Sequence, residues 1–159
     1  MFEHYTERAR RTLFYARFEA SEFGSLAIGT EHLLLGLVRE GKGLTGRREG
    51  KGLTSRVFAD AGVTLRTLRE EILGRMTRGE KISTSVEIPF TAETKRVLQY
   101  AADEADRLRH SYIGTEHLLL GILREEQSTA ASILTSHRIS LDSARASIVA
   151  LLGATEHLG

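Results

Sequence analysis

Apolar residues recur along this chain with helical spacing, and the same spacing appears twice. One predicted helix face combines residues at i, i+3, i+7 and i+10, namely Leu13, Ala16, Ala20 and Phe23. An equivalent face follows at a constant offset of 85 residues, namely Leu98, Ala101, Ala105 and Leu108. The pattern therefore predicts two copies of the same helix, and the chain is expected to be an internal duplication.

An eight-residue string, Gly-Thr-Glu-His-Leu-Leu-Leu-Gly, confirms the duplication. It occurs at residues 29–36 and again at residues 114–121. The register between the copies holds without a gap from residues 6–40 to residues 91–125. A second helix is predicted to start at each copy, and its leucines cover so much of the helix surface that we expect it to be central.

Two shorter helices complete each predicted repeat. In the first repeat they lie near residues 57–61, ending at Gly62, and on Leu65, Leu68 and Ile72. In the second repeat they lie around residues 131–136 and on a face that contains Leu141, Ala144, Ile148 and Leu152. A brief apolar stretch at residues 86–90 is the one segment that could be a strand.

These elements predict an all-α fold with pseudo-two-fold symmetry, in which two four-helix repeats give about eight helices. We place repeat one at about residues 2–75, a polar linker at about 76–88 and repeat two at about 89–153. Because a repeat of roughly 75 residues would be marginally stable alone, we expect one domain over residues 1–159.

A smaller duplication distinguishes the two repeats. Residues 39–47 and 48–56 read REGKGLTGR and REGKGLTSR, which inserts nine residues into repeat one. Five glycines within this segment disfavour a helix, so a basic surface loop over residues 39–56 is predicted. The simplest interpretation is a tolerated insertion; the alternative, binding of nucleic acid through this loop, is weaker.

Composition excludes several classes of function. The chain has 159 residues, a net charge of +1 and no cysteine. This balance gives no case for a nucleic-acid or membrane partner. The lack of cysteine excludes disulfides and is compatible with a cytoplasmic protein.

No nucleophile elbow, phosphate loop or zinc helix is present, so we predict no catalytic residues, cofactor or metal. His32 and His117 directly follow a glutamate and are expected to be packed or capping residues.

The first helix of each repeat starts with groups that suit an anion. Thr6 and Thr91 are candidate N-caps, and Arg10 and Lys95 follow one turn later. A hydroxyl, free backbone N–H groups and a nearby cation together form a typical phosphate site.

The second helix of each repeat starts with groups that suit a cation. Thr30 and Thr115 can cap this helix, while Glu31 and Glu116 present carboxylates that could hold a guanidinium or ammonium group. From these residues alone a structural role is the simpler interpretation, since an acidic residue in the first turn also offsets the helix dipole.

The duplicated Ile-Gly-Thr-Glu-His-Leu-Leu-Leu-Gly string, the threonine-led helix before it and the Leu-Leu-Gly at residues 151–153 resemble the double Clp N-terminal domain. The type is most similar to that of ClpC, an Hsp100 AAA+ unfoldase that feeds a protease. The resemblance covers nearly the whole chain, from Phe2 to about Gly153. It implies an all-α domain of two four-helix repeats, as the periodicity also predicts.

The resemblance implies a docking module without catalytic activity, which receives tagged or unfolded substrates and adaptor proteins for an AAA+ unfoldase and its protease. ClpC-type domains recognise phosphoarginine. By analogy Glu31 and Glu116 would hold its guanidinium part, and its phosphate would be held by Thr6, Thr91, Arg10 and Lys95. The alternative is a stand-alone regulatory subunit that docks on a Clp complex without binding phosphoarginine. No Walker motif follows, so the expected unfoldase acts in cis beyond this sequence or in trans.

Overall fold

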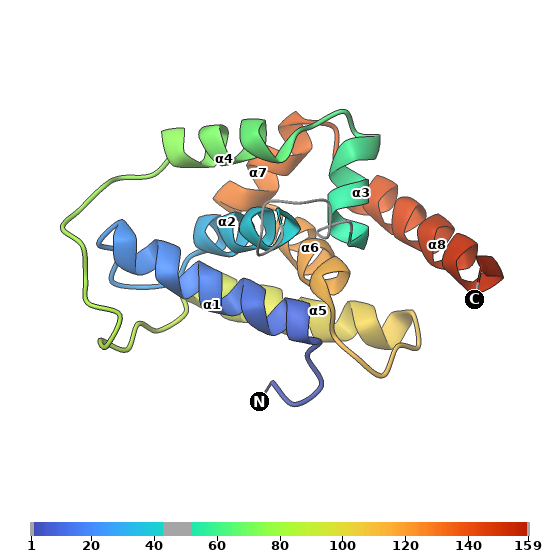
Figure 1. Cartoon of the computed structure of the whole chain (residues 1–159), viewed down its shortest axis with the longest axis horizontal. Helices are drawn as coiled ribbons and strands as arrows, with labels where there is room; N and C mark the ends of the chain where they lie inside the picture. Colours follow the sequence, from blue (N-terminus) through green and yellow to red (C-terminus); the bar gives the residue numbers. More distant parts are fainter. Residues whose placement is uncertain (1, 43–51, 159) are drawn as a thin grey trace.

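The computed structural model describes residues 2–42 and 52–158, with side chains up to residue 153. These residues form eight helices, as the all-α prediction requires (Figure 1). The first repeat contains α1 (Glu7–Glu22), α2 (Thr30–Gly41), α3 (Leu53–Asp60) and α4 (Leu65–Gly74). The second contains α5 (Ala92–Arg107), α6 (Thr115–Arg124), α7 (Thr129–Ser136) and α8 (Leu141–Leu158).

Helices α2 and α6 lie at the centre of the molecule, between α1 and α5 on one side and α4 and α7 on the other (Figure 1). Their leucine triplets are fully buried, namely Leu33, Leu34, Leu35, Leu118, Leu119 and Leu120. The face predicted for the first helix is also buried. Burial of this apolar surface is the main stabilising contribution, at about 25 cal/mol per Å².

The glycine that ends each repeated string permits a close helix crossing. A Cβ atom at Gly36 would overlap the backbone oxygen of Thr12 on α1, and one at Gly121 would overlap the backbone oxygen of Val97 on α5. The neighbouring backbone nitrogen would lie 3.1 Å away in both cases. Only glycine lets the two helix backbones approach this closely, so Gly36 and Gly121 are packing residues.

Each repeat buries one carboxylate on its first helix. The side chain of Glu104 on α5 is 2% exposed and accepts hydrogen bonds at 2.8 Å from both Nε and Nη2 of Arg145 on α8. The guanidinium of Arg124 on α6 lies 3.2 Å away. Hydrogen bonding to Arg145, followed by the charges of both arginines, lowers the pKa of Glu104. In repeat one Glu19 accepts from Arg69 on α4 at 2.8 Å. These pairs join the outer helices within each repeat.

The predicted loop over residues 39–56 is wrong at both ends. Helix α2 continues to Gly41, and α3 begins at Leu53; residues 43–51 lie outside the described part of the chain. Tertiary contacts stabilise the last turn of α2 although the segment is rich in glycine. The Arg39 guanidinium lies 4.8 Å from the ring centre of Phe18, and the buried Glu40 accepts a hydrogen bond from Arg11 at 3.1 Å.

The apolar stretch at residues 86–90 forms no strand. Among the described residues it makes one isolated parallel bridge, between Phe90 and Ile28. The third helix ends as predicted, because Gly62 has a φ of +74°, which an L side chain rarely adopts.

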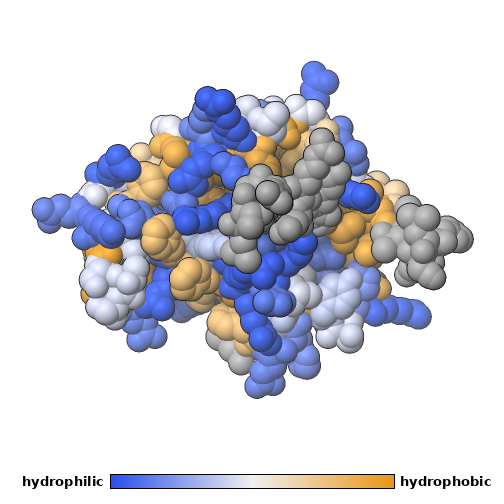
Figure 2. Space-filling model, in the orientation of Figure 1, coloured by the Kyte–Doolittle hydropathy of each residue, from blue (hydrophilic) through white to orange (hydrophobic). Residues whose placement is uncertain are grey.

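The surface carries few large apolar side chains. Phe14, Leu26, Val86 and Val149 are the large hydrophobic residues that are exposed among the described residues. Figure 2 shows hydrophobic groups separated by hydrophilic ones on the face it presents. No helix in the described part of the chain has the length and apolar character needed to cross a membrane.

We expect Gly121→Ala to lower the free energy of unfolding by about 1–3 kcal/mol, because its methyl group would force α5 and α6 apart. Gly74→Ala is the matched control, since a Cβ at Gly74 has no neighbour within 4 Å. This variant should be neutral, or more stable by up to about 1 kcal/mol. Urea denaturation measures both; equal stability of the two variants would contradict the close crossing.

Candidate functional site

The repeated Gly-Thr-Glu-His string forms the start of α2 and of α6. Gly29 and Gly114 are the N-cap residues, so the expectation that Thr30 and Thr115 cap these helices is wrong. The histidine three residues after each glycine performs the capping. The N–H of Gly29 donates to Nδ1 of His32 at 2.9 Å, and the N–H of Gly114 makes the same bond to its histidine at 2.8 Å.

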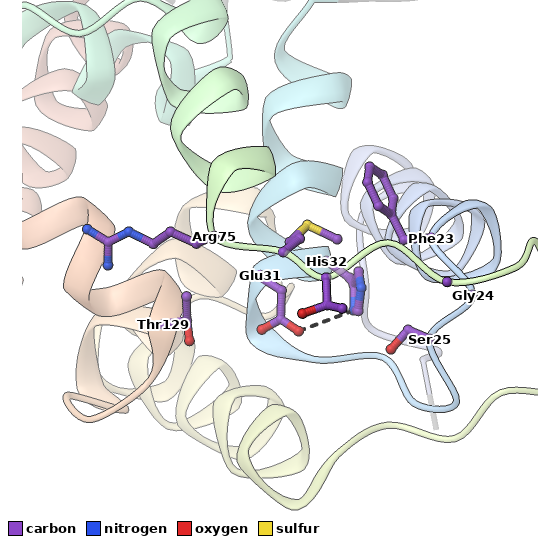
Figure 3. A pocket seen from close by; sticks show the side chains of 10 residues that line it. Phe23, Gly24, Ser25, Glu31, His32, Arg75 and Thr129 are labelled. Carbon is purple, nitrogen blue, oxygen red and sulfur yellow. Dashed lines mark ion pairs between the residues drawn. The ribbon is translucent and has the colours of Figure 1, made fainter.

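This cap fixes the tautomer of both histidines. Because Nδ1 accepts the backbone N–H, the proton of the neutral ring is on Nε2. Burial lowers the pKa of His32, and it lowers the pKa of His117 to about 4. The 3.6 Å approach of Glu31 Oε1 to His32 Nδ1, drawn as a dashed line in Figure 3, therefore joins a carboxylate and a neutral ring at neutral pH. The two histidines are structural, as predicted.

The two glutamates of the string differ in accessibility. Both carboxylates fold back over the N-cap glycine, where a Cβ would overlap their oxygen atoms. The Glu31 side chain is 28% exposed, whereas that of Glu116 is 8% exposed. Burial raises the pKa of Glu116. Glu31 is thus the more accessible cation-binding group of the pair.

Glu31 also lines a cavity of about 420 Å³. Its other walls come from the end of α1, the segment that follows α4 and the start of α7 (Figure 3). These walls include Ser25, Arg75 and Thr129, which sequence reasoning missed. Helical periodicity gives no signal for them, since Ser25 and Arg75 are in connections and Thr129 is an exposed first-turn residue.

Thr6 and Thr91 cap α1 and α5, as predicted. The hydroxyl of Thr6 accepts from the N–H of Ala9, and that of Thr91 from the N–H of Thr94, both at 3.1 Å. The first backbone N–H groups of each helix have no carbonyl acceptor within the helix, because they lie in the first turn. These helix starts can therefore present donors to an anion.

The two cations after these caps are placed differently. Nη2 of Arg10 donates to the backbone oxygens of Phe2 and Glu3, both at 3.3 Å, at the exposed N-terminal turn. Lys95 lines a cavity of about 210 Å³ together with Phe2 and Tyr5. Both cations thus face the N-terminal segment.

Backbone pairing brings the two kinds of helix start together across the repeats. The N–H of Thr91 donates to the oxygen of Ile28 at 3.0 Å, which places the start of α5 beside the start of α2. The N–H of Thr6 donates to the oxygen of Ile113 at 3.0 Å, which places the start of α1 beside the start of α6. The helix start of each glutamate is therefore beside the threonine of the other repeat, an exchange that no local sequence pattern predicts.

The described residues contain no group of three or more His, Cys, Asp or Glu side chains that could hold a metal ion.

Comparison with known sequences identifies the family. The model of the Clp repeat (R) N-terminal domain matches residues 4–137. The negative regulator of genetic competence ClpC/MecB of Bacillus subtilis (strain 168) is 38% identical over 156 residues, which cover 98% of this chain and 18% of the relative. The chloroplastic chaperone protein ClpC1 of Oryza sativa subsp. japonica is 39% identical over 160 residues, 100% of this chain and 16% of the relative. The chain therefore spans less than a fifth of either relative.

Solved structures agree. The N-terminal domain of the protease-associated chaperone ClpD from Arabidopsis thaliana has a TM-score of 0.69 and 27% identity, with 96% of this chain and 97% of that one covered. The N-domain of ClpV from Vibrio cholerae has a TM-score of 0.71 at 14% identity, covering 89% and 80%, and shows the shared fold alone.

His117 should make stability depend on pH. Its pKa falls from 6.5 in the unfolded chain to about 4 in the fold, so the unfolded state binds more protons between these values. Its contribution is present above pH 6.5 and is lost as the pH falls toward about 4. The loss should reach on the order of 3 kcal/mol.

The measurement is chemical denaturation of the wild type and His117→Gln at several pH values. Glutamine can still accept from the N–H of Gly114 but does not titrate. The free energy of unfolding of the variant should therefore fall less on acidification. His4→Gln, at an exposed histidine, is the control and should follow the wild type. Parallel curves for the wild type and His117→Gln would contradict the assignment.

Proposed function

Because this chain belongs to the Clp repeat (R) N-terminal domain family, we propose that it is a docking module that delivers proteins to an AAA+ unfoldase and its protease. It performs no catalysis in this proposal. It captures substrates that carry phosphoarginine and also receives adaptor proteins. The unfoldase is provided by the same polypeptide or by a separate one.

The cross-repeat pairing of helix starts supports phosphoarginine as the ligand. Phosphoarginine combines a guanidinium group and a phosphate joined by one P–N bond, so its site needs an acid and an anion-binding element a few ångströms apart. The start of α2 supplies Glu31, and the start of α5, hydrogen-bonded beside it, supplies N–H donors. In the second site Glu116 and the start of α1 have these roles.

Lys95 and Arg10 are the cations of the two proposed phosphate-binding sites. Lys95 follows Thr91 by about one turn, and Arg10 follows Thr6 in the same way. Arg10 now donates to two backbone oxygens at 3.3 Å in an exposed position. These long bonds are weak enough for the side chain to turn toward a phosphate.

The difference in exposure between the two glutamates predicts two unequal affinities. Glu116 must be uncovered before it can meet a guanidinium group, whereas Glu31 is already accessible. We therefore assign the tighter binding to the site of Glu31, Thr91 and Lys95.

Calorimetric titration with a phosphoarginine peptide tests this function. We expect binding that the unphosphorylated peptide lacks. Glu31→Gln should weaken the tighter phase by more than about tenfold, because it leaves the guanidinium group without its charge partner. The double variant Glu31→Gln/Glu116→Gln should bind at neither site.

Glu126→Gln is the matched control, since Glu126 is exposed and lies after α6, away from both helix starts. Its affinity should equal that of the wild type. Absence of binding by the wild type, or wild-type affinity in the double variant, would refute phosphoarginine recognition.

A further inference from the structure

Repeat two contains an imidazole ring at a position where repeat one contains a serine. The constant offset of 85 residues aligns His110 with Ser25 and Tyr112 with Ala27, while both repeats keep the capping histidine. Two aromatic side chains of repeat two are thus replaced by small ones in repeat one. The side chains that precede α2 are therefore smaller than those that precede α6.

In repeat two the extra ring satisfies the capping histidine. Nε2 of His117 lies 2.8 Å from Nδ1 of His110. Because Nδ1 of His117 accepts from Gly114, its Nε2–H is the donor of this bond and His110 is the acceptor. The His110 ring also stacks on Tyr112, with ring centres 4.9 Å apart and planes at 7°.

In repeat one the same donor has no acceptor. His32 has the same tautomer as His117, and its side chain is 3% exposed. Within the described part of the chain its Nε2–H has no hydrogen-bond partner. No hydrogen bond to Ser25 replaces the missing ring; the Ser25 hydroxyl donates to the backbone oxygen of Ala27 at 2.8 Å. This N–H is therefore available to a hydrogen-bond acceptor that enters beside the ring.

A cavity is present where the missing ring would lie. His32 and Ser25 both line the space of about 420 Å³ that also contains the Glu31 carboxylate (Figure 3). Phe23 and Met76 form an apolar part of the cavity wall. A planar ring with an unprotonated ring nitrogen could accept the Nε2–H of His32 in this space.

We propose that this cavity binds an imidazole ring, supplied by a histidine side chain of a docked protein. One ring nitrogen accepts from Nε2–H of His32, as His110 does from His117 in repeat two. The site does not require phosphoarginine, so it extends the proposed function without depending on it.

Free imidazole is the first probe. It is titrated into the wild type at a pH of about 8, where the ring is neutral, and amide and imidazole signals are followed by NMR. We expect saturable shifts at Ser25, Glu31 and His32, with an affinity on the order of millimolar. Ser25→His fills the space from within and should weaken binding at these residues by at least about tenfold. Equal affinity in the wild type and Ser25→His would overturn the proposal.

The reverse substitution gives an independent test that does not depend on the folding of Ser25→His. His110→Ser combined with Tyr112→Ala reproduces the residues of repeat one in repeat two and should create a second imidazole site, seen as shifts at His117. Absence of this site, together with absence of shifts at His32 in the wild type, would also overturn the proposal.

A peptide pair tests the source of the ring. A short peptide with one central histidine should compete with imidazole at His32, and the same peptide with alanine should not. Equal competition by both would refute a histidine side chain as the ligand. Failure here leaves phosphoarginine binding unaffected, because Glu31→Gln tests that function in the absence of imidazole.

Discussion

Two short parallel backbone pairings between the repeats are the constraint on which the candidate sites depend. Tyr5 pairs with Ile113, and Ile28 pairs with Phe90. Beside each pairing, the N–H of the threonine that caps the following helix donates to a backbone oxygen of the other repeat. The first helix of one repeat is therefore fixed beside the second helix of the other. Neither repeat could form this arrangement alone, which gives a physical reason for the duplication.

Contacts within each repeat also stabilise that arrangement. A glycine at the end of the leucine run lets the first and second helices cross closely, and a buried carboxylate binds arginines of the later helices. Because breaking a buried ion pair costs about 3–5 kcal/mol, these contacts hold the helices in one register. The helix starts are then rigid enough to present an acid and N–H donors at a fixed separation.

The two candidate sites are not structurally equivalent. In repeat one Ser25 lines the cavity beside Glu31, whereas in repeat two His110 and Tyr112 lie beside the capping histidine. The Glu31 side chain is thus accessible, and the Glu116 side chain is largely covered. A module of this kind can bind one group tightly and a second weakly, which suits capture of flexible chains by several contacts.

Sequence reasoning predicted the eight helices, their buried faces and the caps at Thr6 and Thr91, because helical periodicity and capping are local properties. Sequence reasoning failed where tertiary contacts determine the ends and caps of the helices. The buried pair of Glu40 and Arg11 extends α2 through a segment rich in glycine, and His32, not Thr30, caps that helix. The exchange of partners between repeats and the cavity beside Ser25 depend on side chains far apart in the sequence, so no local pattern could indicate them.

The central claim is that each ligand site combines helix starts from both repeats. Amide NMR of Glu31→Gln during titration with phosphoarginine tests it most directly. We predict that this variant loses the ligand-induced shifts at Gly29 and at Ala92 to Thr94 of the other repeat, and keeps those at Glu7 to Ala9 and Gly114. Loss of the shifts at Glu7 to Ala9, with those at Ala92 to Thr94 retained, would contradict the account.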